Sequence, residues 1–303
     1  MISDIPSIRI ARVLAAPVVA LLLATACAPV SQSAPGSSPT GSARVSPSPS
    51  PTPTPIPKHV FVIVLENTSY QLALRQPYIA GLAQQYAVAT NYSAVGSPSL
   101  PNYLAMTSGS TWGIRDDGYH QLPATGLGNQ LTGAGISWKA YMEGFTGDCF
   151  NSPYPYALKH NPFAYYGGAC PANVVPMTDL ASDLTGDTPQ LSWITPGMCN
   201  DGHDCGVAAA DRWLSGTVPQ VTSSTAWQQG GALFIVWDES SANDARVALL
   251  VLTQNVRGQL TMPLDHFSLS ATIADLLGVP RLGQSKQASS LAAQVTAGTP
   301  RSA

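Results

Sequence analysis

Residues 59–65 read His-Val-Phe-Val-Ile-Val-Leu, a nearly continuous run of β-branched and other apolar side chains. Such a run is typical of a strand that is buried on both faces of a mostly parallel sheet. Further strands are expected at 136–142, 190–195, 231–237 and 247–252, with a short one from Val88. Helices are expected at 78–86, 99–109, 127–135, 207–214 and 269–278. The pattern predicts an α/β fold with a mostly parallel central sheet and helices on both faces.

Pairs of polar side chains follow two of these predicted strands directly. Glu66 and Asn67 come after the first run, and Asp238 and Glu239 come after the run at 231–237. Parallel strands bring their carboxyl ends to the same edge of a sheet, where α/β proteins place ligand sites. The four side chains are therefore candidates for one site, although Asn67 could instead cap a helix in an ordinary solvated turn.

Residues 97–109 read Ser-Pro-Ser-Leu-Pro-Asn-Tyr-Leu-Ala-Met-Thr-Ser-Gly. The pattern predicts a tight loop that ends at Ser99, the expected N-cap, followed by a helix that Gly109 ends. The N-terminus of a helix favours anions, because its N–H groups are unpaired and its dipole is positive there. Ser99 is therefore a candidate for phosphate chemistry, with an ordinary capped helix as the alternative.

Two carboxylates and an imidazole lie close together in the sequence, at Asp201, His203 and Asp204. Such spacing suits metal binding or phosphate chemistry, in which fixed side chains must converge. A purely structural loop is the alternative. Two more histidines stand apart from this group: His160 lies in a long excursion, and His266 is expected just before a helix. A lone histidine in a loop is more often a surface or structural group.

Composition limits the classes of function. Only 10% of the 303 residues are charged and the net charge is -3, so no basic surface predicts nucleic-acid binding. Apart from Cys27, the chain has four cysteines. Three pairings are possible, and sequence proximity together with export favours Cys149–Cys170 and Cys199–Cys205. Free or metal-binding thiols are the alternative.

The start of the chain predicts export. Residues 1–26 have the charge, apolar core and small residues of a signal peptide, and the core is too short to span a bilayer. The sequence Leu-Ala-Thr-Ala-Cys that ends at Cys27 resembles a lipoprotein signal, which predicts a lipid anchor on the outer face of the cell membrane. Plain secretion is the alternative.

The rest of the chain divides by composition into three parts. Residues 27–57 are rich in Ser, Pro and Thr and predict a disordered tether. Residues 58–283 are expected to form one folded domain, and residues 284–303 a polar tail. The sequence has no Gly-x-Ser-x-Gly elbow, no Walker-type loop and no Gly-x-Gly-x-x-Gly fingerprint. An ordinary α/β-hydrolase and nucleotide-driven chemistry are therefore disfavoured.

Several motifs in order resemble the bacterial phosphoesterase family, which belongs to the alkaline phosphatase superfamily. The motifs are Val62-Ile63-Val64-Leu65-Glu66-Asn67, the stretch at 97–109, Lys159-His160-Asn161-Pro162-Phe163, Asn200-Asp201-Gly202-His203-Asp204, Trp237-Asp238-Glu239 and His266-Phe267-Ser268-Leu269. The resemblance covers about residues 58–280 and implies an alkaline-phosphatase-like fold. The family holds secreted acid phosphatases and phospholipases C, and the short chain is most similar to the secreted acid phosphatases of mycobacteria.

The resemblance implies a role for each matched residue. It makes Ser99 a metal-bound nucleophile and gives Asn102, His160 and His203 contacts to the phosphoryl group or the leaving oxygen. The implied metal ligands are Glu66, Asn67, Ser99, Asp201, Asp204, Asp238, Glu239 and His266. Whether Asp201 or Asp204 contacts the metal directly or orients His203 stays open. Ca²⁺, Mg²⁺, Mn²⁺, Zn²⁺ and Fe all suit parts of this ligand set.

The expected function is a metal-dependent acid phosphatase that hydrolyses phosphate monoesters, phosphoinositides among them, through a phosphoserine. The segment between Glu239 and Val247 is short, which favours monoesters over large lipid substrates. One alternative is a phospholipase C or phosphodiesterase that acts on a phospholipid headgroup. Another is a surface lipoprotein that binds phosphate groups without turnover. The protein is expected to be a monomer.

Overall fold

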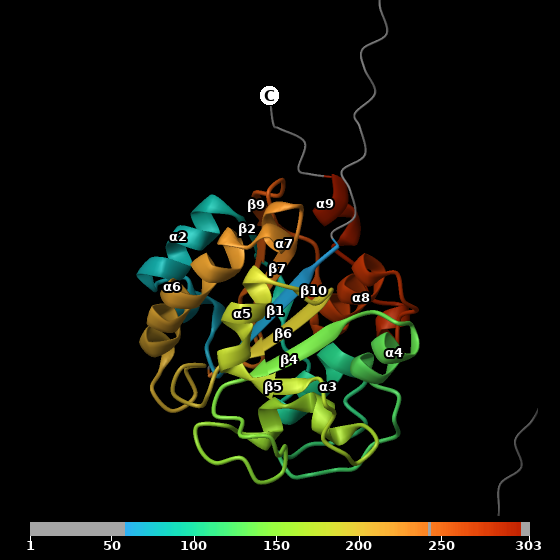
Figure 1. The fold of residues 1–303 in the computed structure, drawn as a ribbon. Coiled ribbons are helices and arrows are strands. Elements are labelled where there is room, and N and C mark those ends of the chain that lie inside the picture. Colours follow the sequence, from blue (N-terminus) through green and yellow to red (C-terminus); the bar gives the residue numbers. More distant parts are fainter. Residues whose placement is uncertain (1–57, 242–243, 298–303) are drawn as a thin grey trace, which may run out of the picture. The chain divides into compact units, whose positions relative to one another are not determined.

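The computed structural model describes residues 58–241 and 244–297. The predicted signal peptide, Cys27 and the predicted tether lie outside the described residues. One eight-stranded sheet dominates this part of the chain, in the order β5-β4-β6-β1-β7-β8-β2-β9 (Figure 1). Its strands are β1 Val60–Leu65, β2 Ala87–Ala89, β4 Trp138–Met142, β5 Val174–Pro176, β6 Leu191–Thr195, β7 Ala232–Trp237, β8 Leu249–Leu252 and β9 Gly258–Leu260.

Every neighbouring pair in this sheet is parallel except the pairs that β8 makes with β7 and β2. The predicted strand at 247–252 is thus the one that runs against the others. A small second sheet pairs β3 Tyr92–Ser93 with β10 Leu264–Asp265. At the centre lies β1, all six residues of which are buried, between β6 and β7. The run at 59–65 therefore forms the expected central strand.

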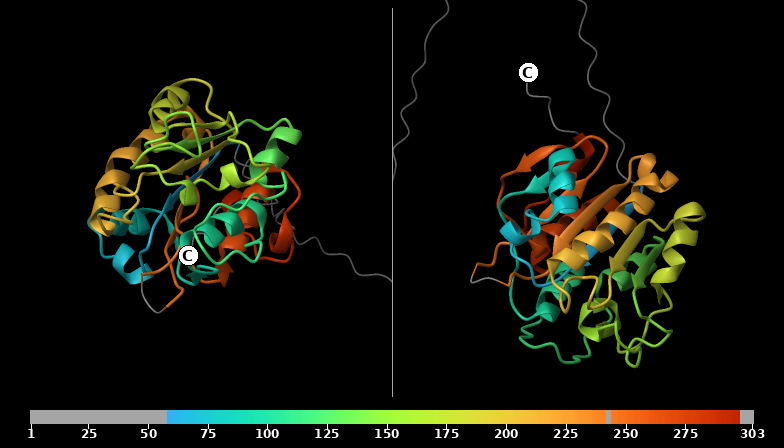
Figure 2. Two further views of the ribbon diagram at one scale, coloured as in Figure 1. Left: turned by 90° about the horizontal axis from the view of Figure 1, so that it is seen from below. Right: turned by 90° about the vertical axis from the view of Figure 1, so that its left-hand side faces the viewer.

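Helices cover both faces of the sheet, as Figure 2 shows. One group holds α2 Pro77–Gln85, α5 Leu180–Thr185, α6 Val207–Ser223 and α7 Thr225–Gln228. The other holds α3 Ser99–Ser108, α4 Leu127–Gly133 and α8 His266–Leu277. Shorter elements are α1 Tyr70–Ala73, α9 Ala292–Ala297 and the 3₁₀ helices η1 Leu158–His160, η2 Pro162–Tyr165, η3 Met177–Asp179 and η4 Gly283–Lys286. The predicted α/β class is confirmed.

Three boundaries differ from the sequence prediction. The helix expected at 207–214 continues to Ser223, with Pro219 inside it. His266 is the first residue of α8 and does not precede it. The polar tail predicted from residue 284 is wrong up to residue 297, because Leu291 and Val295 are buried in the core. These two apolar residues lie four apart, so they share one face of the short α9 region.

Both predicted disulfides are present. Cys149 and Cys170 close a loop with a sequence separation of 21 residues, and Cys199 and Cys205 close one of 6. The second bridge fixes the ends of the loop that carries Asp201 and His203. Among the described residues, no helix has both the length and the apolar composition that a membrane span requires.

Candidate active site

Three strand ends bring the predicted site residues to one edge of the sheet. Glu66 follows β1 and Asp238 follows its neighbour β7, while Asp201 lies in the loop after β6. Backbone hydrogen bonds tie these segments together: the Glu66 N–H donates to the Asp201 carbonyl (3.0 Å), and the Asp238 N–H to the Leu65 carbonyl (2.9 Å). The shared edge that the strand pattern predicts therefore exists.

Ser99 points into this edge from the first turn of α3. Its hydroxyl donates a 2.9 Å hydrogen bond to Oε2 of Glu66, and both side chains are buried. The prediction that Ser99 is the N-cap is wrong, because Pro98 holds that position and Ser99 is the first helical residue. The Ser99 hydroxyl is therefore not used to cap its own helix and is directed at the carboxylate.

His160 lies between two buried carboxylates. Its Nε2 is 3.1 Å from Oε1 of Glu66, and its Nδ1 is 3.2 Å from Oδ2 of Asp201. Burial acts to lower the pKa of His160, but the charges and hydrogen bonds of the two carboxylates raise it to about 9. The ring of Tyr103, on α3, stacks on the imidazole at 5.2 Å between centroids. The two carboxylates thus favour the protonated form of the buried His160 at neutral pH.

The carboxylates respond to burial in different ways. Burial favours a higher pKa for Glu66, yet the charge of His160 and hydrogen bonds from His160, Tyr103 and Ser99 bring the pKa below its ordinary value. Burial raises the pKa of Asp201, because the hydrogen bond and charge of His160 offset it only in part. The pKa of Asp238 lies well above its usual range, through burial and then the charges of Glu66 and Glu239.

Asp238 has one oxygen paired and one unpaired. Its Oδ1 accepts the N–H groups of Asn67 (3.3 Å) and Glu239 (2.5 Å), while its buried Oδ2 has no hydrogen-bond partner among the described residues. Asn67 has a φ of 49°, a conformation that non-glycine residues rarely adopt outside functional or turn positions. A buried oxygen without a donor is costly unless a cation or a proton meets it.

The chemical types of the side chains at this edge suit a hard cation, but their positions do not enclose one. Within 58–241 and 244–297, no three His, Cys, Asp or Glu side chains are arranged so that they could hold a metal ion. The buried set nevertheless has more carboxyl groups than basic groups, because His160 faces Glu66 and Asp201 while Asp238 is buried at the same edge of the sheet. Carboxylate, hydroxyl and amide oxygens at Glu66, Asp238, Ser99 and Asn67 are donors that hard cations prefer.

A less buried layer of charged groups adjoins this cluster. Nδ1 of His203 is paired with Oδ1 of Asp204 (2.8 Å), and Nε2 of His203 is 3.1 Å from the Lys159 ammonium. The backbone N–H of His203 donates to Oδ1 of Asp201 (2.8 Å). The two aspartates, which the sequence left undistinguished, therefore differ in position. Asp201 is buried against His160, and Asp204 is an exposed group that orients His203.

The structure does not support His266 as a metal ligand. Nδ1 of His266 is bonded to the Tyr92 hydroxyl (2.8 Å), and Nε2 to the backbone carbonyl of Asp238 (2.5 Å). Burial lowers the pKa of His266 to about 4, so the ring is neutral. With both nitrogens paired to protein atoms, His266 positions the Asp238 backbone from the start of α8.

Asn102 also differs from its predicted role as a phosphoryl contact. Its Oδ1 accepts the N–H groups of Val95 and Gly96 (both 3.1 Å), and its Nδ2 donates to the carbonyls of Gly96 (3.0 Å) and Pro98 (3.2 Å). The fully buried amide therefore uses its donors and acceptors on the loop before Ser99. Asn102 holds this loop in place.

Sequence reasoning missed four further residues at this edge. They are Tyr103, which stacks on His160, Asp117 and Lys159 at the rim, and Glu143 at the end of β4. Glu143 accepts the Gly197 N–H (2.7 Å) and the Asn200 amide (2.8 Å), which fixes the loop that carries Asp201. Lys159 belongs to the motif that also contains His160, and Glu143 directly follows the strand predicted at 136–142, so the sequence pattern could have indicated both as site residues. Asp117 had no such indication, since its sequence Asp-Asp-Gly is typical of a plain turn.

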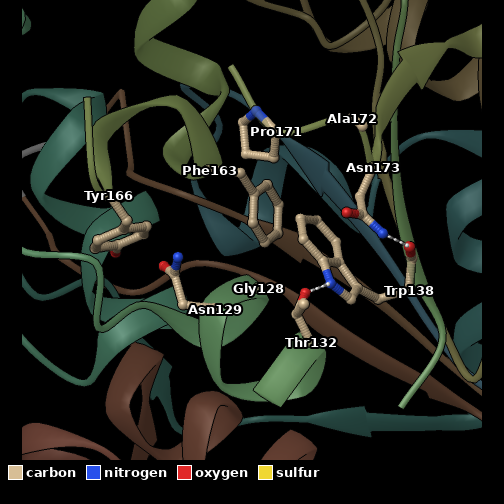
Figure 3. Close-up of a pocket in the computed structure, with 9 residues that line it drawn as sticks. All are labelled: Gly128, Asn129, Thr132, Trp138, Phe163, Tyr166, Pro171, Ala172 and Asn173. Carbon is tan, nitrogen blue, oxygen red and sulfur yellow. Dashed lines mark hydrogen bonds between the residues drawn. The ribbon is translucent and has the colours of Figure 1, made fainter. Parts of the chain in front are cut away.

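An aromatic cavity of about 260 Å³ lies elsewhere, beside α4 and the amino end of β4 (Figure 3). The rings of Trp138 and Phe163 form one wall, and the Trp138 indole N–H donates to the Thr132 hydroxyl (2.9 Å). No carboxylate, imidazole or ammonium group is among its lining residues. The acid–base groups therefore gather at the opposite ends of the strands, around Ser99.

Comparison with known proteins gives a consistent result. The sequence model of the Phosphoesterase family matches residues 73–248. A probable acid phosphatase of Kluyveromyces lactis is 30% identical over 251 residues, which cover 75% of this chain and 60% of that protein. A phosphatidylinositol-3-phosphatase of Mycobacterium tuberculosis is 26% identical over 76% of this chain and 80% of that protein. The chain thus spans about 60% of the yeast relative's length and most of the mycobacterial one.

Solved structures resemble the fold at low sequence identity. A putative sulfatase of Bacteroides thetaiotaomicron matches with a TM-score of 0.56 and 12% identity, over 81% of this chain and 76% of that one. A protein of the alkaline phosphatase superfamily from Vibrio parahaemolyticus matches with a TM-score of 0.53 and 12% identity, over 77% and 71%. These likenesses support the expected alkaline-phosphatase-like architecture.

Proposed function

Because this chain belongs to the Phosphoesterase family, we propose that it is an exported, metal-dependent acid phosphatase of phosphate monoesters with Ser99 as the nucleophile. The observation that carries the proposal is the buried Ser99 hydroxyl, bonded to Glu66 at the start of α3 amid further carboxylates. The yeast and mycobacterial relatives, both named as phosphatases, match about three quarters of this chain, which supports a phosphoric ester as the substrate.

The proposed metal ion is divalent or trivalent, and its proposed ligands are Glu66, Asn67, Ser99 and Asp238. The unpaired, buried Oδ2 of Asp238 and the oxygen-rich donors favour a hard cation such as Mg²⁺, Mn²⁺ or Ca²⁺, while Zn²⁺ and Fe stay candidates. Glu239, at the same strand end, is a further candidate ligand. When bound, such an ion favours the alkoxide form of a serine at neutral pH.

Different side chains of this site have different roles in the proposed in-line displacement at phosphorus. The oxygen of Ser99 attacks phosphorus, the bond to the ester oxygen breaks, and water then hydrolyses the phosphoserine to release inorganic phosphate. The N–H groups at the start of α3 and the Lys159 ammonium are placed to stabilise charge on the phosphoryl oxygens. His203 is held by Asp204 and partly exposed, and its Nε2 accepts from the Lys159 ammonium; once protonated at Nε2, it would give that proton to the leaving oxygen.

The test is hydrolysis of p-nitrophenyl phosphate and bis-p-nitrophenyl phosphate from acid to alkaline pH. Wild type, Ser99→Ala and a chelator-treated sample are compared, with Ser108→Ala as the control at the other end of α3. The proposal expects monoester turnover that Ser99→Ala and the chelator abolish. Preference for the diester would point to a phospholipase C or phosphodiesterase. Phosphate binding without turnover of either ester would leave a binding lipoprotein.

A further inference from the structure

A carboxylate from elsewhere in the chain already occupies the N-terminus of the Ser99 helix. The Leu100 N–H, directly after Ser99, donates a 3.0 Å hydrogen bond to Oδ1 of Asp117. The N-cap residue Pro98 makes no side-chain hydrogen bond to the helix. The first turn of α3 therefore relies on an anion that comes from outside the helix.

A cation holds the other oxygen of Asp117. Its Oδ2 accepts a 3.1 Å hydrogen bond from Nζ of Lys159, and the same ammonium is 3.1 Å from Nε2 of His203. The side chains of Asp117 and Lys159 are 30% and 18% exposed, so this pair lies at the open rim. A helix N–H next to the reactive serine and an ammonium are the donors that bind a phosphoryl group.

We propose that Asp117 is an internal competitor of the substrate's phosphoryl group, an inference that rests on the proposed function. Asp117 occupies the anion position beside Ser99 in the free protein, and a phosphate monoester displaces it to reach the Leu100 N–H and Lys159. Asp117 thereby sets the affinity for phosphate, and its return to the helix N-terminus helps the product phosphate to leave.

The charge at the rim supports this role. Glu239 and Asp204 also carry carboxylates at this end of the site, and Glu66, Asp201 and Asp238 lie deeper. An incoming phosphate dianion therefore meets several negative groups, and at the rim Lys159 offers it a counter-charge. As long as Asp117 is paired with Lys159, that counter-charge is neutralised. Removal of the Asp117 charge should raise the affinity for phosphate.

The chain offers a matched control for the capping role. Asp211, on α6, caps the start of α2 in the same way: its Oδ1 accepts the Ile79 N–H (2.9 Å) and its Oδ2 the Tyr78 N–H (3.3 Å). The preceding N-cap, Gln76, likewise offers no side-chain bond. α2 belongs to the helix group on the other face of the sheet from α3 (Figure 2). Asp211→Asn therefore removes the charge of a comparable cap far from Ser99.

The experiment measures binding of inorganic phosphate by titration calorimetry to metal-loaded protein. The protein carries Ser99→Ala, so that phosphate binds without forming a phosphoserine. Added Asp117→Asn should lower the Kd for phosphate about fivefold, the effect of one partly exposed charge. Lys159→Met should raise the Kd, and Asp211→Asn should lower Tm without a change in Kd. Asp117→Ser, which keeps a good helix-capping group, serves as a second variant if Asp117→Asn does not fold.

The outcomes separate this inference from the proposed function. An unchanged or raised Kd in the Asp117 variants would overturn the competitor role and leave Asp117 as a helix cap only. A lowered Kd supports it. The protein with Ser99 intact is assayed for hydrolysis in parallel. If it hydrolyses no phosphate ester while the Asp117 variants still show a lowered Kd, the competitor role of Asp117 is supported and only the hydrolase proposal is overturned.

Discussion

The hydroxyl of Ser99 is bonded to the carboxylate of Glu66 at 2.9 Å, although the two residues lie thirty-three positions apart. Glu66 ends the central strand β1, and Ser99 begins a helix that packs beside α8 on one face of the sheet. Their distance is therefore fixed by the packing of two rigid elements, which is the condition that an in-line attack requires.

Asn102→Ala should lower kcat by about 10–100-fold and the free energy of unfolding by about 2–3 kcal/mol. The amide holds four backbone groups of the loop before Ser99, so its loss releases that loop and shifts the serine. Steady-state kinetics and urea unfolding check the prediction, with Asn129→Ala, an exposed asparagine, as the control. Wild-type stability together with a loss of phosphate affinity would restore the role first expected for Asn102.

The case of Asn102 shows where sequence reasoning stops. The motif at 97–109 places Asn102 near Ser99, because a helix brings residues three apart to one face. Whether its amide faces the substrate or the preceding loop depends on how residues 95–98 fold back, and no local pattern encodes that. The same holds for Ser99 itself, whose helix begins one residue earlier than capping preference predicts.

Cys199→Ser together with Cys205→Ser should lower the free energy of unfolding by about 2–3 kcal/mol. The small loop that they close carries Asp201 and His203, so kcat should fall as well. Removal of Cys149–Cys170 as the matched control should cost at least as much stability, because its loop is longer. Full kcat in the first variant would show that the loop holds its side chains without the bridge.

Removal of the metal should abolish turnover, and addition of a suitable ion to chelator-treated protein should raise Tm by about 5–10 °C at a hundredfold excess over Kd. Asp238→Asn should lose this rise, because the unpaired Oδ2 is a proposed ligand. Asp183→Asn, at a surface ion pair with Lys139, should keep it. Full activity after chelation, or no rise with Ca²⁺, Mg²⁺, Mn²⁺, Zn²⁺ or Fe, would contradict the metal proposal.

In chelator-treated protein, the stability should fall as pH rises from about 6.5 to about 9. Burial alone would lower the pKa of His160, but Glu66 and Asp201 raise it to about 9 in the folded state, against the ordinary histidine value of 6.5. A raised folded pKa means that the protonated form stabilises the fold; this contribution is complete below the unfolded pKa and is lost through the folded one. Urea unfolding across this range should give a flatter profile for His160→Asn, and equal slopes would contradict the prediction.

The fold was more accessible to sequence reasoning than the site. The run at 59–65 and the carboxylates after β1 and β7 predict the sheet and its active edge, because burial and strand direction are local properties of the chain. The antiparallel direction of β8 and the packing of α9 depend on partners far away in the sequence. Asp117 is the clearest case, since only the folded chain brings that turn to the start of α3.

The most direct test of the central claim is to find where the phosphoryl group is attached during turnover. Metal-loaded protein is mixed with p-nitrophenyl phosphate, quenched in acid within milliseconds and analysed by peptide mass spectrometry. We expect phosphorylation at Ser99 in the wild type and in the Ser108→Ala control, and neither phosphoprotein nor turnover in Ser99→Ala. Turnover by Ser99→Ala at the wild-type rate, or a phosphoryl group attached to another residue, would contradict the assignment of Ser99 as the nucleophile.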